Sequence, residues 1–252
     1  LPTQAVRDLD IQKRENDLAV ATFGRGFYIL DNYSSLRETS EKVLNDENYK
    51  LFPVKNALMF TKRSATFSGV GASFYKADNP PFGASFTYYI KEATKTLKQQ
   101  RQEKEKELIK SNEPVYYPSF DDLRKEDDEE KPFLLFTIYD HAGNVVRKLK
   151  TKVESGINRF VWDLRYASTD PIKKATDENP SGYPVMPGKY KVTMSISIDG
   201  LLKEVAGPVE FEAKVLNNVT LPASDRNELV AFQNKVNDLN RAVNGAIEVS
   251  SD

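Results

Sequence analysis

Side chains suited to catalysis are scarce in this chain. It has one histidine, His141, and no cysteine, so thiolate nucleophiles, disulfides and cysteine-bound metals are excluded. A Ser-His-Asp triad would have to use this single imidazole. The sequence around it, Asp-His-Ala-Gly-Asn, is typical of a tight turn. We therefore interpret His141 as a turn residue rather than a general base or a metal ligand.

Acidic side chains gather in residues 121–130, where their oxygens could hold Ca²⁺. The run lacks the Asp-x-Asp-x-Asp-Gly spacing of a calcium loop, so we interpret it as a solvated run of charge. The sequence predicts neither a metal site nor a cofactor.

The single tryptophan, Trp162, is followed by Asp163, a pair that could bind sugar by stacking beside a carboxylate. However, Trp162 shares strand parity with Phe160, which predicts that the indole is buried. Asp163 is then expected to cap a turn or to pair with Arg165.

Two tyrosine pairs could also form an aromatic binding surface. Adjacent residues on a strand point to opposite faces, so at most one of Tyr88 and Tyr89 is expected at the surface. For Tyr116 and Tyr117 the sequence leaves exposure open.

Composition limits the class of protein. The 252 residues carry a net charge of −1, which does not favour nucleic acid as a partner. No apolar run is long enough to span a membrane. The chain opens on Leu1 without a signal-peptide pattern, and we expect it to be a piece of a longer protein.

The strongest structural signal lies in residues 156–198. The run GINRFVW has an apolar centre, and KYKVTMSISI alternates strictly, as half-buried strands do. The pair Asp199-Gly200 then predicts a two-residue hairpin turn. Further strands are predicted at 84–91, 133–139, 145–150 and 201–215, a spacing typical of a β-sandwich. The predicted core residues are Phe136, Ile138, Phe160, Trp162, Tyr190 and Val192, and the predicted turn glycines are Gly24, Gly26, Gly143, Gly188 and Gly200.

Residues 17–32, DLAVATFGRGFYILDN, read as a hairpin whose Gly-Arg-Gly forms a turn, since a strand and not a phosphate-binding helix follows it. They resemble the closing blade of the sortilin-like, BNR-type β-propellers of large secreted bacterial proteins, many labelled glycosyl hydrolase. In that family a histidine usually precedes Gly-Arg-Gly, where this chain has Phe23, and Asp-Asp usually ends the strand, where it has Asp31-Asn32. The Asp-box pattern of such propellers is absent, so the resemblance implies only the tail of a propeller.

The segments LFTIYDHAGNVVRKLK, GINRFVWDLR and VMPGKYKV resemble the Ig-like domain of the flagellar hook-capping protein and the Ig-like module that follows sortilin-like propellers. The resemblance implies an Ig-like antiparallel β-sandwich, a fold that hosts many functions. We predict a blade remnant and linker over 1–50, the sandwich over 51–218 and a C-terminal helix over 219–252, which we expect to be capped by Ser224 or Asp225 and truncated at its end.

Residues 92–131 are expected to be a charged helical insertion between two strands, solvated or partly disordered and without core residues. The stripe Leu229, Phe232, Val236, Leu239 and Val243 predicts a helix that faces either the sandwich or another helix.

These patterns predict a non-catalytic accessory module of a larger exported bacterial protein. It would pack on the β-propeller of the same parent chain and present a surface to glycan or peptide. Two alternatives stay open. The parent could be a glycoside hydrolase to which Asp31 contributes one of the two carboxyl groups such enzymes need, or the insertion could bind a partner protein.

Overall fold

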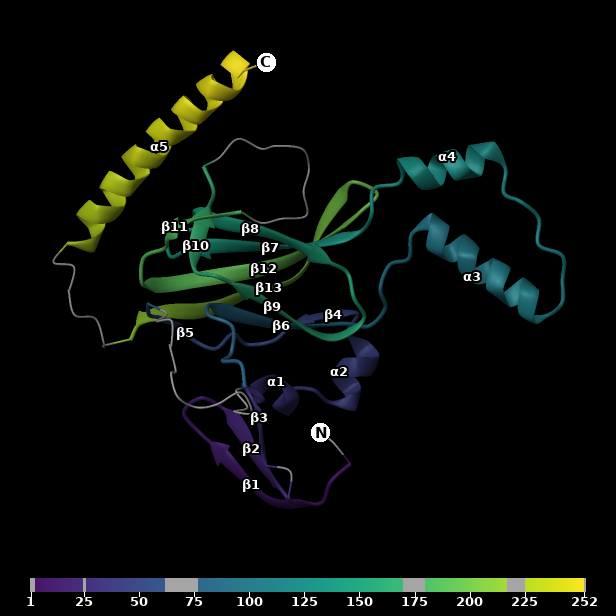
Figure 1. Ribbon diagram of the computed structural model, residues 1–252, viewed down its shortest axis with the longest axis horizontal. Helices are drawn as coiled ribbons and strands as arrows, with labels where there is room; N and C mark the ends of the chain where they lie inside the picture. The colour runs from purple at the N-terminus through teal and green to yellow at the C-terminus, as the bar shows by residue number, and fades with distance from the viewer. Residues whose placement is uncertain (1–2, 25, 62–76, 170–179, 217–224, 252) are drawn as a thin grey trace, which may run out of the picture.

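The computed structural model describes residues 3–24, 26–61, 77–169, 180–216 and 225–251 (Figure 1). The chain is mainly β, and the predicted class of a β-sandwich with a helical insertion and a C-terminal helix is confirmed. No helix in these ranges is long and apolar enough to cross a membrane.

Two sheets form the sandwich. The first is five-stranded, in the order β5 (Ala57–Met59), β13 (Leu201–Val215), β12 (Gly188–Ile198), β7 (Phe133–Asp140) and β8 (Val145–Lys152). The second is three-stranded, in the order β4 (Tyr49–Leu51), β6 (Ala84–Ile90) and β9 (Gly156–Trp162). All pairs are antiparallel except that β5 runs parallel to β13.

This order is that of an immunoglobulin-like sandwich. The sheet β4-β6-β9 corresponds to strands A, B and E, and β13-β12-β7-β8 corresponds to G, F, C and C′. The tryptophan lies on the E-like strand β9, whereas antibody domains carry theirs on strand C.

The two sheets enclose an aromatic core. Phe136 lies at its centre, with ring centroids 5.7 Å from Phe86, 5.3 Å from Tyr88 and 5.5 Å from Phe160. Phe136, Ile138, Val192 and Trp162 are fully buried, Tyr190 is nearly so, and Phe160 is partly buried against them. The alternation that predicted the strands therefore has a physical basis, since these side chains point between the sheets.

Tyr190 forms a tyrosine corner at the start of β12. Its hydroxyl donates to the carbonyl oxygen of Met186, four residues upstream, as the corner tyrosine does in immunoglobulin-like folds. Its ring meets the indole of Trp162 edge to face at 5.4 Å. The sequence Pro-Gly-Lys-Tyr thus joins a turn to the core.

Predicted turns fall between the expected strands. Asp199 and Gly200 both have positive φ, 51° and 75°, which is the conformation of a type I′ hairpin turn. The turn residues Gly24, Gly26 and Gly143 also have positive φ, and Gly188 is the first residue of β12.

Three further parts surround the sandwich (Figure 1). The N-terminal sheet consists of β1 (Val6–Gln12), β2 (Asp17–Thr22) and β3 (Phe27–Leu30), and is joined to β4 by α1 (Ser34–Arg37) and α2 (Glu41–Asp46). The helical arm, α3 (Leu97–Lys110) and α4 (Phe120–Asp128), is inserted between β6 and β7. The C-terminal helix is α5 (Arg226–Ser251).

Two stretches hold more structure than the sequence suggested. The segment 33–50, interpreted as a linker, contains α1 and α2 and begins β4. Residues 164–186, a polar stretch with three prolines and no strand pattern, carry the ribbon β10 (Arg165–Ala167) and β11 (Ser181–Pro184), while residues 170–179 lie outside the described part. Asp225 accepts a hydrogen bond from the Glu228 amide at 3.0 Å at the start of α5, and Ser224 lies outside the described residues.

Candidate functional site: two exposed apolar surfaces

The residues that could do chemistry are not brought together. His141 is exposed in the β7–β8 turn, where the Asp140 carboxylate accepts from the Ala142 amide at 2.9 Å and the Asn144 amide at 2.8 Å. Asp31 is half-buried after β3, and its backbone oxygen accepts from the Arg159 guanidinium at 3.2 Å. In the described ranges no group of three or more His, Asp or Glu side chains is placed to hold a metal.

The Trp162-Asp163 pair is not a sugar platform. The indole is fully buried and donates to the carbonyl oxygen of Arg165 at 2.9 Å. Asp163 accepts from the Arg165 amide at 3.2 Å and from the Ser181 hydroxyl, so its carboxylate caps the turn and fixes the ribbon β10–β11.

Arg147 is a buried charge that the sequence reading missed. It points inward from β8 and donates to the carbonyl oxygen of Tyr166 on the ribbon. Burial lowers the pKa of this guanidinium, and the carboxylate of Asp163 opposes that effect. The sequence did contain one indication that Arg147 is buried. Arg147 lies two residues before the buried Leu149 on the same strand, so both side chains point to the same face of the sheet. The group holds the ribbon on the sandwich.

A shallow depression of about 460 Å³ lies on the outer face of the five-stranded sheet, beside His141. Lys191 and Glu204 line it. Because Lys191 also pairs with Glu210 at 3.2 Å, its charge is partly neutralised. The depression offers a single imidazole and no converging set of donors.

The N-terminal sheet exposes apolar side chains on both faces. Strand register puts Leu9, Ile11 and Leu30 on one face and Phe27 and Ile29 on the other. All five are exposed, and Phe27 retains 80% of its accessible surface. On the face of Leu9 the central residue Val20 is buried, whereas the face of Phe27 and Ile29 contains no buried residue among those described.

Polar contacts tie this sheet to the sandwich. Lys55 pairs with the Glu15 carboxylate and donates to the Glu15 carbonyl oxygen at 3.0 Å. This contact lowers the pKa of Glu15. The Arg159 guanidinium also donates to the carbonyl oxygen of Asn32 at 3.3 Å. These contacts hold the sheet in place; Val20, on the central strand and on the same face as Leu9, is buried, while the large apolar side chains of β1 and β3 stay exposed.

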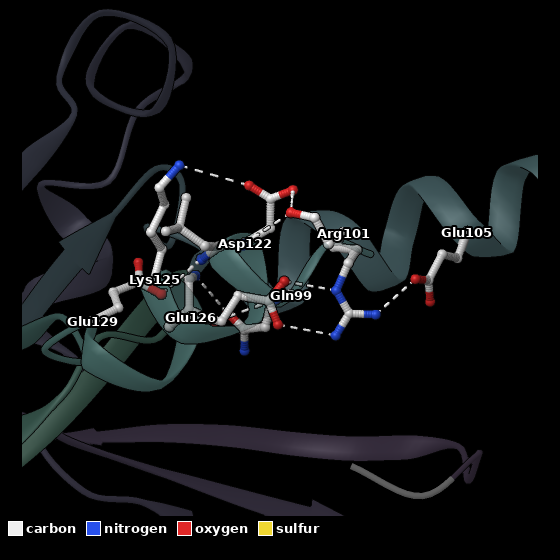
Figure 2. Close-up of polar contacts among 10 residues, drawn as sticks. Gln99, Arg101, Glu105, Asp122, Lys125, Glu126 and Glu129 are labelled. Atoms are coloured by element: carbon white, nitrogen blue, oxygen red, sulfur yellow. Dashed lines mark hydrogen bonds and ion pairs between the residues drawn. The ribbon is translucent and has the colours of Figure 1, made fainter. Parts of the chain in front are cut away.

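The helical arm is fastened by charge rather than by an apolar core, as Figure 2 shows. Arg101 on α3 makes a two-pronged contact with Glu126 on α4, at 2.6 and 2.9 Å, and a third contact with Glu105 at 2.6 Å. The guanidinium lowers the pKa of Glu126. The Leu97 amide donates to the Glu129 carboxylate at 2.8 Å. Neither helix contains a buried residue.

Side-chain caps set both helix starts in the arm. Thr96 and Gln99 form a reciprocal capping box at the start of α3, and Ser119 accepts from the Asp122 amide at the start of α4. The insertion is thus an ordered hairpin, and the absence of core residues from it agrees with the sequence expectation.

The end of this hairpin, here called the arm tip, is aromatic. Tyr116 and Tyr117 keep 81% and 87% of their surface, and Phe120 keeps 79%. Ile109 and Val115 are exposed beside them. Tyr88 and Tyr89, by contrast, are both buried in the sandwich. Of the two tyrosine pairs, it is therefore Tyr116 and Tyr117 that are exposed, at the end of the arm away from the sheets (Figure 1).

Comparison with known proteins adds no assignment. No family model matches the chain, and no curated protein matches it.

Proposed function

We propose that this chain is a non-catalytic module of a larger exported bacterial protein, and that it packs on the β-propeller of that protein through its N-terminal sheet. The observation that supports this most is the pair of exposed apolar faces on β1–β3. A propeller blade lies between neighbouring blades, so both of its faces are apolar. The resemblance of residues 17–32 to a closing blade supports the same proposal.

Small residues support close packing on one of these faces. Ala19 and Ala21 lie between Phe27 and Ile29 on β3 and Asp8 and Asp10 on β1. Alanine side chains are short, so the backbone of a neighbouring sheet can approach this face closely. The adjacent apolar strip of Phe27 and Ile29 would then pack against that sheet. Phe27 and Ile29 are both exposed and adjacent on this face, and a contiguous exposed apolar patch is typical of an interaction surface.

The test is a pair of substitutions in the chain preceded by its proposed propeller. Leu9→Asp and Phe27→Asp, one on each face, should lower the melting temperature of the longer protein by several degrees. In the 252-residue chain the same changes should have little effect, because both side chains are already exposed. Lys13→Asp, in the β1–β2 turn, is the matched control. Equal, small effects in both proteins would refute the proposal.

The arm tip supports a second candidate function, binding of a partner protein. Exposed tyrosines and a phenylalanine are the residues that most often anchor interfaces. Tyr116→Ala with Tyr117→Ala should then abolish capture of a partner that wild type binds, whereas Lys104→Ala on the exposed side of α3 should not. Capture that survives the tyrosine changes would remove this candidate.

A further inference from the structure

The C-terminal helix α5 carries an apolar seam that its own chain does not cover. Residues at alternating spacings of three and four are all exposed; they are Leu229, Phe232, Val236, Leu239, Val243 and Ala246. This is the a and d spacing of a coiled coil, sustained over three heptads. No ionisable side chain interrupts it. We call these six residues the α5 seam.

The helix turns its polar side toward its own molecule. The Tyr183 hydroxyl of β11 donates to the Asn234 side chain. Val230, on the same side, is half-buried. At about 100° per residue these positions lie nearly opposite the α5 seam. Figure 1 shows α5 standing apart from the two sheets. The seam is therefore directed away from the sandwich.

We propose that the α5 seam binds the α5 seam of a second copy of this chain, with the two helices antiparallel. In this arrangement Leu229 meets Ala246, Phe232 meets Val243 and Val236 meets Leu239 of the other copy. Each larger side chain faces a smaller one. The spacing between the two helices that each pair of side chains requires is therefore similar along the whole seam. A two-fold axis between Val236 and Leu239 relates the two copies, which makes the contact closed and self-complementary.

The parallel alternative packs less evenly. It would place Phe232 against Phe232 and Ala246 against Ala246, which crowds one layer and leaves a gap in another. It would also bring both sandwiches to the same end of the helix pair.

Charge permits the antiparallel pairing. Lys235 flanks the seam and falls beside Ala242 of the other copy, and Glu228 falls beside Val249. The two Lys235 side chains lie about seven residues apart along the pair, roughly 10 Å. No like charges meet, so the pairing is not opposed electrostatically.

The expected affinity is modest. The seam from Leu229 to Ala246 is about 26 Å long, which gives an interface at the small end of the specific class. We expect a dissociation constant of roughly micromolar size.

The first experiment measures mass in solution by sedimentation velocity over a concentration series. The wild-type chain should approach twice its 28.5 kDa as concentration rises. Leu239→Glu places a charged side chain in both of the layers where Leu239 of one copy meets Val236 of the other. This variant should be a monomer at every concentration. Ala231→Glu, an exposed position on the same helix outside the seam, should dimerise as wild type does. Trp162 fluorescence reports in each variant that the sandwich is folded.

A monomeric wild type at every concentration would overturn the proposal. So would a Leu239→Glu variant that dimerises like Ala231→Glu, because the contact would then lie elsewhere.

The second experiment tests helix direction, and the absence of cysteine makes it clean. Leu229→Cys and Ala246→Cys are purified separately, mixed and oxidised by glutathione disulfide. Antiparallel pairing predicts a disulfide between the two variants, with little self-crosslinking of either alone. Rapid self-crosslinking of Leu229→Cys alone would show parallel helices and overturn the proposed register.

Discussion

The sandwich and the helical arm achieve order in opposite ways. The sandwich buries a continuous aromatic core around Phe136, whereas the arm buries no residue of either helix and relies on Arg101, Glu126 and helix caps. Burial of apolar surface is insensitive to salt and pH, while exposed ion pairs are weak and screened. The sandwich therefore acts as the stable frame, and the arm carries its tip on contacts that solution conditions can loosen.

The largest effect is expected at the centre of the core. Phe136→Ala removes a ring that contacts Phe86, Tyr88 and Phe160 and leaves a cavity between the sheets. The free energy of unfolding should fall by about 3–5 kcal/mol. Phe120→Ala, at the exposed arm tip, removes the same ring and should stay within about 0.5 kcal/mol of wild type. Urea denaturation monitored by Trp162 fluorescence measures both, and equal losses would contradict the contrast.

The tyrosine corner should give an intermediate effect. Tyr190→Phe keeps the ring against Trp162 but leaves the Met186 carbonyl oxygen without this donor. We expect a loss of about 1–2 kcal/mol in the free energy of unfolding. Tyr28→Phe removes a hydroxyl from the N-terminal sheet instead and serves as the control. A Tyr190→Phe variant as stable as this control would argue against a stabilising corner.

The arm should respond to Arg101 while the sandwich does not. Arg101→Met removes the contacts to Glu105 and Glu126, so α4 amides should exchange hydrogen faster. Lys104→Met, on the exposed side of the same helix, should leave this exchange unchanged. The unfolding midpoint of the sandwich should be the same in both. Slow α4 exchange in Arg101→Met would show that another contact orders the arm.

Acid should loosen the arm before the core. Arg101 lowers the pKa of Glu126 in the folded chain. A depressed folded pKa stabilises the arm above the unfolded value of about 4.3, and that contribution is lost as pH falls through the folded pKa. Chemical shifts of α4, followed from about pH 6 to about pH 3, should lose helical character while those of β12 do not. Simultaneous loss in both elements would contradict a separate arm.

The smallest effect is expected for Asp31→Asn. The contact between Asp31 and Arg159 uses the backbone oxygen, so the free energy of unfolding should stay within about 0.5 kcal/mol of wild type. If the chain is non-catalytic, glycan hydrolysis by the longer parent should also be unchanged. A large loss of hydrolysis with stability preserved would instead favour the glycoside hydrolase alternative.

Alternation predicted the sandwich strands well because apolar side chains at every second position point between the two sheets, even where the opposite face, as in β12, is also buried. The run at 188–198 and the turn Asp199-Gly200 have local signals, a period of two and a residue pair suited to positive φ. Sheet order could not be obtained in this way, since the pairing of β13 with β5 joins residues far apart in sequence.

The surfaces were harder to predict. Tyr88 and Tyr89 lie in a predicted strand, whereas Tyr116 and Tyr117 lie between Pro114 and Pro118, but which of them are exposed depends on what the fold brings nearby. The only indication in the sequence that Arg147 is buried is its position two residues before Leu149 on a predicted strand. Its role can be inferred only once the fold places the ribbon β10–β11 over it.

Hydrogen exchange of the β1–β3 amides tests the central claim most directly. In the 252-residue chain these amides should exchange at least about 100-fold faster than those of β12, because most of the large apolar side chains of the sheet are exposed. When the proposed propeller precedes the chain, their exchange should slow toward that of β12. Protection of β1–β3 equal to that of β12 in the shorter chain would contradict the claim that this sheet requires a neighbour.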